Sequence, residues 1–319
     1  MIESVPRTDA SLYTLVEDFF RNSFTTDNPL ITEAIKRMLQ AGGKRLRPRI
    51  TLLAAEASGG RAEKHLHLAA YMELIHVATL IHDDVVDNAQ TRRGVNATAV
   101  DYGNRISVLA GDYLFAWIFK NVTAQYPNPI PNILSATLAD ICDGEVMQLQ
   151  ALGNLDLSLD AYVETVMKKT ASLFAASAEC GAIMGGASPA EVQALRNFGL
   201  YYGIAFQMLD DLLDMTADAQ ALGKPVGNDL AERKITIPLI LALDAADSGT
   251  RTLVERFYGG ENGVSTAAVI AAVERSGGLR GTKRRIAHYG HRAKASLAPL
   301  KHSVAKVELQ RLADGLTAQ

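Results

Sequence analysis

Hydrophobic residues recur at helical spacing along most of the chain. The first such stripe, in residues 11–22, consists of Leu12, Leu15, Val16, Phe19 and Phe20. Later segments open at Pro29 and Pro48 and close at glycine pairs, the asymmetry expected of the two ends of a helix. The pattern predicts helices over 11–22, 29–41, 48–58, 62–87, 104–124, 130–152, 159–185, 188–216, 231–247, 264–275, 280–297 and 301–314.

Evidence for strands in the sequence is poor. There is no sustained alternation between hairpin turns, and no strand leads into a glycine-rich phosphate loop. No solenoid repeat or low-complexity linker divides the chain. We therefore expect an all-α fold in a single domain over residues 1–319, although that length exceeds the usual range of one core. Two segments, 66–82 and 198–215, are apolar around most of their circumference and are expected inside the bundle.

Composition and charge exclude several classes of protein. The 319 residues include 32 basic and 35 acidic side chains, so the net charge of -3 gives no reason to expect a nucleic-acid partner. Two cysteines, Cys142 and Cys180, cannot form a disulfide framework and suit a reducing compartment. The N-terminus has no signal-peptide core, and no stretch reaches the ~18 apolar residues of a membrane span. We expect a cytoplasmic protein without an integral membrane segment.

Each of the two apolar segments ends in a cluster of aspartates. The first cluster is Asp83, Asp84 and Asp87, and the second is Asp210, Asp211 and Asp214. Residues four apart on a helix lie about 40° apart around the axis and ~6 Å along it. Asp83 and Asp87 should therefore share a face, as should Asp210 and Asp214.

Clustered carboxylates at the end of an apolar helix point to a bound divalent cation. They repel one another, apolar surroundings raise that cost, and the helix dipole opposes them at a C-terminus. Oxygen-only ligands fit Mg²⁺, which also takes waters and phosphate oxygens. Zinc lacks a Cys/His quartet here, and the EF-hand loop pattern is missing. A solvated acidic helix end is the alternative, and the second copy disfavours it.

Basic residues near the clusters could bind a diphosphate. The segment 42–48, Gly-Gly-Lys-Arg-Leu-Arg-Pro, puts three cations at a helix junction, where free backbone N–H groups favour anions. Each basic group alone is more often surface charge, and only the nearness to the aspartates changes that reading. The other basic groups are Arg92 and Arg93, Lys168 and Lys169 with Thr170, and Lys224 and Lys234 around a polar loop.

The combined motifs resemble the trans-isoprenyl diphosphate synthase (polyprenyl synthetase) family. They are GGKRLRP, HDDVVDxxxxRRG, KKT, FQxLDDLLD and GKPxGxDL, and they cover residues 40 to 240 in the family's order. The resemblance implies a bundle of long helices around a central active-site cavity, the isoprenoid synthase fold. It implies head-to-tail coupling of an allylic diphosphate, farnesyl or geranylgeranyl, with isopentenyl diphosphate, and a homodimer.

The resemblance also implies a role for each motif residue. All six aspartates would hold Mg²⁺, three ions with substrate bound, against the allylic diphosphate. Residues that would contact the same diphosphate are Arg92, Lys169 and Lys234, with Lys224 in the polar loop before the last. Those that would bind isopentenyl diphosphate are Lys44, Arg47, His76 and Arg93. Thr170 and Gln207 would face the developing allylic cation, and Phe206 would pack near the second substrate. His82 is interpreted as structural.

The helix before Asp83 offers a prediction of product length. Positions Ala78, Ile75, Leu74 and Tyr71 form one stripe leading into the bundle. Tyr71 is the first bulky residue, ~18 Å from Asp83 along a helix. A channel of that depth takes several isoprene units beyond farnesyl. The motif Asp-Asp-Val-Val-Asp also resembles that of the long-chain bacterial enzymes that make quinone side chains, so we expect a long all-trans polyprenyl diphosphate, heptaprenyl or octaprenyl. The alternatives are a farnesyl or geranylgeranyl product, or one subunit of a heteromeric synthase.

Other features bear on rival interpretations. A terpene cyclase would normally have an Asn/Ser/Glu metal triad in place of the second cluster. This chain has Asp210, Asp211 and Asp214 there, which argues against that class. Arg233 stands where many members of the family have glycine, so the direction of the Lys234 side chain does not follow from the resemblance. A basic stretch in residues 280–294 reads as a solvated helix face, with transient contact to membrane lipid during product release as the alternative.

Overall fold

The computed structural model describes residues 9–22, 24–92, 94–216, 226–245, 247–261 and 263–317, with side chains from residue 14 onward. The chain folds into two compact units. Unit 1 comprises residues 1–135, 176–196 and 300–306, and unit 2 comprises 136–175, 197–299 and 307–319. The prediction of a single domain over residues 1–319 stays a prediction.

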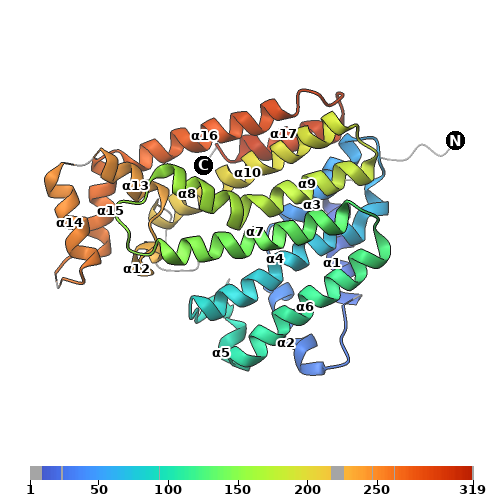
Figure 1. Ribbon diagram of the computed structural model, residues 1–319, viewed down its shortest axis with the longest axis horizontal. Coiled ribbons are helices and arrows are strands. Elements are labelled where there is room, and N and C mark those ends of the chain that lie inside the picture. Colours follow the sequence, from blue (N-terminus) through green and yellow to red (C-terminus); the bar gives the residue numbers. More distant parts are fainter. Residues whose placement is uncertain are drawn as a thin grey trace. The chain divides into compact units, whose positions relative to one another are not determined.

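The described chain is helical nearly throughout (Figure 1), which confirms the all-α prediction. The long helices are α1 (Asp9–Asn22), α2 (Pro29–Gln40), α3 (Leu46–Ala57), α4 (Leu66–Val86), α6 (Asn104–Gln125), α7 (Ile130–Gln150), α9 (Ser172–Gly185), α10 (Pro189–Thr216), α14 (Ser248–Tyr258), α15 (Thr266–Arg275), α16 (Gly278–Ser296) and α17 (Val304–Gly315). Shorter ones are a 3₁₀ turn (Ala62–His65), α5 (Thr98–Tyr102), α8 (Leu159–Val166), α12 (Asn228–Ala231) and α13 (Ile237–Asp244). Strands β1 (Thr91–Arg92) and β2 (Val95–Asn96) form one small antiparallel pair.

Several predicted boundaries are wrong. The predicted helix over 231–247 is the shorter α13, which begins where Pro238 fits the first turn of a helix. The sequence prediction missed α14, whose polar face hides its apolar stripe, and the five-residue α5. Within the predicted helix 159–185, residues Met167–Ala171 form a π-helical stretch between α8 and α9. The three basic-motif residues Lys168, Lys169 and Thr170 lie in that stretch.

In unit 1, helix α4 lies in the core. It packs against α3 and α6, and from Leu68 to Ile75 each of its side chains is buried. Such all-round burial is what an apolar circumference predicts. In unit 2, α13 packs against α16 and α15 (Figure 1), and the part of α10 from residue 197 onward buries Phe198, Tyr202, Met208 and Leu212. Both expectations of interior helices are confirmed within their own units.

No helix in the described ranges has the length and apolarity needed to cross a membrane.

Candidate active site

The first aspartate cluster lies at the C-terminal end of α4. Asp83 and Asp84 belong to the last turn, and Asp87 caps it, its N–H donating to the carbonyl of Asp83. Asp84 is fully buried, whereas Asp83 and Asp87 are half-buried. Asp83 and Asp87, four residues apart, thus share a face that is more accessible to solvent than Asp84, which points into the protein.

Asp84 carries a buried charge that one cation only partly compensates. The Nε of Arg92, on β1, donates to its Oδ1 at 2.5 Å. Burial raises the pKa of the Asp84 carboxyl, and the Arg92 guanidinium opposes that shift. The other oxygen, Oδ2, is buried and has no hydrogen-bond partner among the described residues. An unsatisfied buried carboxylate oxygen fits a hard divalent cation, so these residues suit Mg²⁺.

His82 is held against α6 by its own contacts. Its Nε2 lies 3.0 Å from the carbonyl oxygen of Val108, and its ring meets Phe115 edge-on. Gly111 allows this approach, because a Cβ at that position would lie 2.2 Å from the same nitrogen. These contacts support the structural interpretation of His82.

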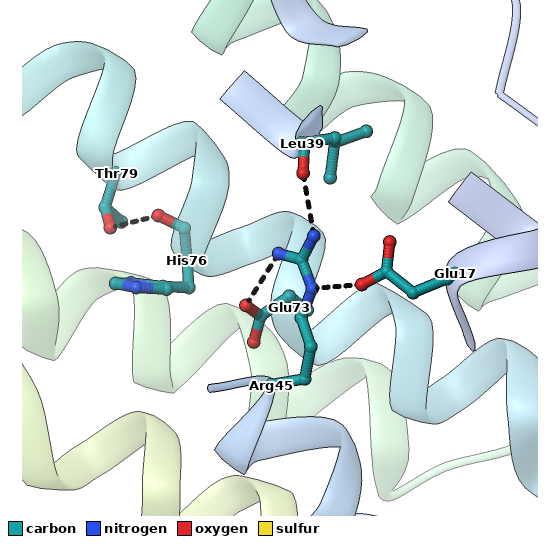
Figure 2. A network of polar contacts seen from close by, with 6 residues as sticks. All are labelled: Glu17, Leu39, Arg45, Glu73, His76 and Thr79. Carbon is teal, nitrogen blue, oxygen red and sulfur yellow. Dashed lines mark hydrogen bonds and ion pairs between the residues drawn. The ribbon is translucent and has the colours of Figure 1, made fainter. Parts of the chain in front are cut away.

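The basic segment before α3 divides into inward and outward side chains. Lys44 is exposed, Arg47 is buried, and Arg45 between them is buried in an ion-pair network (Figure 2). The expectation that all three cations form one anion cradle is therefore wrong for Arg45, whose charge is compensated by Glu17 and Glu73. Lys44 and Arg47 remain candidates, with half-buried His76 on α4.

In unit 2, the second cluster is anchored by hydrogen bonds. Asp211 accepts from the hydroxyl of Tyr162 at 2.5 Å and from Nε2 of Gln207 at 2.9 Å. Burial raises the pKa of Asp211 to about 6, although both hydrogen bonds lower it. Asp210, next to it, is exposed. Asp211 is therefore oriented by the protein, and Asp210 is open to solvent.

The buried Asp214 holds the backbone of residues 227–229. Its Oδ2 accepts from the N–H of Asp229 at 3.1 Å, and its carbonyl accepts from the N–H of Gly227 at 2.7 Å. The carbonyl of Asp229 in turn accepts from the N–H of Lys234 at 2.9 Å. The second cluster and Lys234 are therefore linked through one backbone path.

Lys234 is also fixed by the residue before it. Arg233 adopts φ 62°, the left-handed conformation that costs a non-glycine residue about 1–3 kcal/mol. Its Nη1 donates to the carbonyl of Tyr258 at 2.7 Å, and the Tyr258 hydroxyl donates to the carbonyl of Lys234 at 3.1 Å. The Nζ of Lys234 pairs with Glu232 at 2.7 Å. An arginine thus serves where glycine would fit the backbone more easily.

The π-helical stretch brings Lys169 and Thr170 to the second cluster's helix and to α7. The Thr170 hydroxyl donates to Oε1 of Gln207 at 2.9 Å. Lys169 pairs with Glu145 and donates to Gln148 Oε1 at 2.6 Å. A Cβ on Gly144 would lie 2.4 Å from the Lys169 backbone nitrogen, so glycine is needed for this approach. Thr170, Gln207 and Asp211 form one continuous chain of hydrogen bonds.

The four residues of the proposed product-length stripe are all buried in unit 1. Tyr71 is surrounded by aromatic rings, with centroids 6.1 Å away for Phe19, 5.9 Å for Trp117 and 6.4 Å for Tyr126. Its hydroxyl accepts from Gln125 at 3.0 Å. Tyr71 is therefore held in place by residues of other segments, which the stripe on one helix did not reveal.

The sequence model of the polyprenyl synthetase family matches residues 28–275. The chain belongs to this family. It is 37% identical over 276 residues to octaprenyl diphosphate synthase of Escherichia coli, covering 86% of this chain and 85% of that one. It is 36% identical over 305 residues to a short chain isoprenyl diphosphate synthase of Methanothermobacter thermautotrophicus, covering 94% of both.

Solved structures agree with this membership in the polyprenyl synthetase family. A decaprenyl diphosphate synthase from Rhodobacter capsulatus superposes with a TM-score of 0.90 at 38% identity, over 97% of this chain and 96% of that one. The chain is accordingly an all-α prenyltransferase of the polyprenyl diphosphate synthase type. The names of its relatives span short and long products, so membership leaves product length open.

Within the family's motifs, the structure adds residues and leaves some undescribed. Arg93 and Lys224 lie outside the described residues. Tyr162 and Glu73 were missed by the sequence reasoning, and Arg45 was assigned to the wrong role, because their partners lie 28 to 49 residues away. Among the described side chains, no three or more His, Cys, Asp or Glu residues converge in a ready-made metal cage. Carboxylates that bind one or two positions of a hydrated Mg²⁺ need no such cage.

Proposed function

We propose that the protein condenses an allylic diphosphate, farnesyl or geranylgeranyl, with successive isopentenyl diphosphates and releases a long all-trans polyprenyl diphosphate. The buried, unsatisfied Oδ2 of Asp84 carries the proposal, because it calls for a cation in the motif that the family resemblance assigns to the allylic diphosphate. The metal would be held by the six aspartates of the two clusters. When bound, Mg²⁺ supplies charge neutralisation at the diphosphate.

The basic residues would stabilise the leaving group. Breaking the allylic C–O bond leaves a diphosphate whose negative charge grows toward the transition state, so a fixed cation stabilises that state more than the ground state. Arg92, Lys169 and Lys234 would take this role. Each is paired with a carboxylate of its own unit, Asp84, Glu145 and Glu232 respectively. Substrate binding would then exchange these carboxylates for phosphate oxygens.

Thr170 and Gln207 would face the carbocation. The Gln207 amide has a fixed orientation, since its Nε2 donates to Asp211 and its Oε1 accepts from Thr170. Its oxygen still has a second lone pair to offer to developing positive charge. The isopentenyl double bond then attacks the cation and forms the new C–C bond, and the resulting carbocation loses a proton to give an alkene. The departing diphosphate is a suitable base for that proton.

The second diphosphate would bind to a separate, metal-free set of residues. We assign Lys44, Arg47, His76 and Arg93 to isopentenyl diphosphate, with Phe206 packed near it. Phe206 belongs to an aromatic group with Phe174 at 5.4 Å and Tyr202 at 6.3 Å between centroids.

Product length would follow from the stripe Ala78, Ile75, Leu74 and Tyr71. The small side chain at 78 leaves the start of the stripe open, and the ring cluster at Tyr71 would close it. A shorter farnesyl or geranylgeranyl product is the second candidate, favoured by the 36% identity to the short chain isoprenyl diphosphate synthase.

The metal requirement is tested with the purified chain, radiolabelled isopentenyl diphosphate and farnesyl diphosphate. We expect condensation to stop with a chelator and to return with excess Mg²⁺. Asp84→Asn should remove most of the activity, whereas Asp18→Asn, at an exposed acidic position on α1, should not. Full activity in the chelator, or an active Asp84→Asn enzyme, would reject the role of this cluster.

We also propose a homodimer, as the family resemblance implies. Light scattering should give twice the chain mass of 34.3 kDa, and condensation by the purified chain alone would exclude a heteromeric synthase. A protein confined to the cytoplasm, touching lipid only during product release, completes the proposal.

A further inference from the structure

Arg45 lies at the centre of a buried polar network in unit 1 (Figure 2). Its Nε donates to Glu17 Oε1 at 2.7 Å, its Nη1 to Glu73 Oε1 at 3.2 Å, and its Nη2 to the carbonyl of Leu39 at 2.7 Å. The guanidinium also sits 5.1 Å from the ring centroid of Phe20. Arg45 therefore joins the segment before α3 to three helices, α1, α2 and α4.

The backbone of this segment is bent to make that connection. Arg45 has φ 46° and ψ 41°, a left-handed conformation that a non-glycine residue adopts only when its surroundings enforce it. Helix α3 begins at the next residue, Leu46. Lys44 before the bend is exposed, whereas Arg45 is only 3% exposed. The left-handed bend at Arg45 thus lies between the exposed Lys44 and the buried Arg47.

Glu73 connects the network to the turn of α4 that carries His76, which is assigned to isopentenyl diphosphate together with Lys44 and Arg47. It is 2% exposed and lies three residues before His76 on α4. Residues three apart on a helix lie on neighbouring turns of the same side. The main chain beyond His76 is itself tied down, its carbonyl accepting from the Thr79 hydroxyl at 2.8 Å (Figure 2). One ion pair therefore links the Lys44–Arg47 segment to the turn of α4 that carries His76.

We propose that Arg45 and Glu73 are positioning residues for the metal-free diphosphate, holding Lys44 and Arg47 in register with His76. The inference rests on the assignment of those three residues to isopentenyl diphosphate under the proposed function. Arg45 itself is not placed to touch the diphosphate, because its side chain is only 3% exposed and each of its three nitrogens is turned toward Glu17, Glu73 or Leu39. Its effect is transmitted through the backbone that it bends.

A merely structural ion pair makes a different prediction. Losing it would reduce the folded fraction, and with it the turnover per mole of protein, without changing affinity for one substrate over the other. A positioning pair changes the affinity for isopentenyl diphosphate and leaves that for the allylic diphosphate unaffected. The comparison of the two Michaelis constants therefore separates the two roles.

Two variants remove the pair in different ways. Glu73→Gln keeps the shape and removes the charge. The double variant Arg45→Met/Glu73→Leu replaces the pair with apolar side chains of similar size, a change that often leaves stability unchanged or raises it when both partners are replaced together. It also removes the partner of Glu17, whose side chain is 18% exposed. Arg37→Met is the matched control, because Arg37 on α2 pairs with Asp101 at 2.5 Å in the same unit but is far less buried. Lys44→Ala tests the subsite itself.

The experiment measures KM for both substrates, kcat, and the metal-free Kd of isopentenyl diphosphate by calorimetry, each per mole of folded protein. We expect both pair variants to raise KM and Kd for isopentenyl diphosphate by about tenfold, since a misplacement of about 1 Å can cost up to about a hundredfold. KM for farnesyl diphosphate should stay within about twofold, as should all constants of Arg37→Met.

Three results would overturn the inference. Unchanged KM and Kd in Glu73→Gln, beside a raised KM in Lys44→Ala, would reject the positioning role alone. Equal increases for both substrates would show a general structural effect. Unchanged constants in Lys44→Ala would reject the subsite of the proposed function and, with it, the inference. If the double variant does not fold, Glu73→Gln decides.

Discussion

Replacing Tyr162 with phenylalanine removes one hydroxyl and nothing else from a fully buried contact. That hydroxyl donates to Asp211 Oδ2 at 2.5 Å, and Asp211 is 4% exposed. A hydrogen bond to a charged group contributes about 1.5–3 kcal/mol, and here the variant would leave a carboxylate oxygen buried without it. The entropy of unfolding is about 2.1 cal/mol/K per residue, taken over 319 residues. Dividing the lost free energy by this total entropy predicts a fall in Tm of about 2–5 °C.

The same variant should weaken metal-dependent activity. A residue that orients a metal-binding carboxylate typically contributes about 10–100-fold in metal affinity or activity. Tyr162→Phe should therefore raise the Mg²⁺ concentration for half-maximal activity by about that factor. The assay is a Mg²⁺ titration of isopentenyl diphosphate incorporation at saturating substrates, with Tm measured by calorimetry.

Tyr201→Phe is the matched control in the same unit. Its hydroxyl accepts from Arg292 at 2.6 Å in an exposed position, where a hydrogen bond stabilises little, so Tm should change by less than about 1 °C. If the two variants give the same Tm and the same Mg²⁺ titration, the orienting role of Tyr162 is wrong, and with it the part we give to Asp211.

Three further predictions test separate features. Gly111→Ala should displace the His82 ring and lower the free energy of unfolding by about 1–3 kcal/mol, whereas Gly249→Ala, where the nearest side-chain atom would be 3.7 Å away, should not; equal stability in denaturant titrations would contradict the close approach. Arg233→Ala and Arg233→Gly both lose the contact to the Tyr258 carbonyl, but only glycine relieves the positive φ. The free energy of unfolding of Arg233→Gly should therefore be about 1 kcal/mol higher than that of Arg233→Ala in denaturant titrations. The reverse order would count against the left-handed backbone. Ala78→Tyr should shorten the product, seen by chromatography of the dephosphorylated chains, and unchanged chain length would reject the stripe as the determinant.

The helices and the aspartate clusters could be predicted because their signals are local. The nearly continuous apolar circumference of α4 and of the later part of α10 predicts that both are interior helices, and an i, i+4 pair such as Asp83 and Asp87 shares a face on any helix. The basic motifs were found by their order along the chain.

What could not be predicted depends on contacts between distant segments. Arg45 looked like a third cation of the anion cradle, and only the structure shows that it is buried and paired with Glu17 and Glu73. Tyr162 carried no signal at all, because its partner Asp211 lies 49 residues further on. The π-helical stretch at Lys169 was also hidden, since it depends on Gly144 of another helix allowing close approach.

The central claim is that this polyprenyl synthetase elongates an allylic primer to a long chain using its own residues alone. It is tested most directly by incubating the purified protein with Mg²⁺, farnesyl diphosphate and radiolabelled isopentenyl diphosphate, and by resolving the extracted alcohols by chain length. Our account predicts heptaprenyl or octaprenyl as the main product. A product that stops at geranylgeranyl, or no product without a second polypeptide, would contradict it.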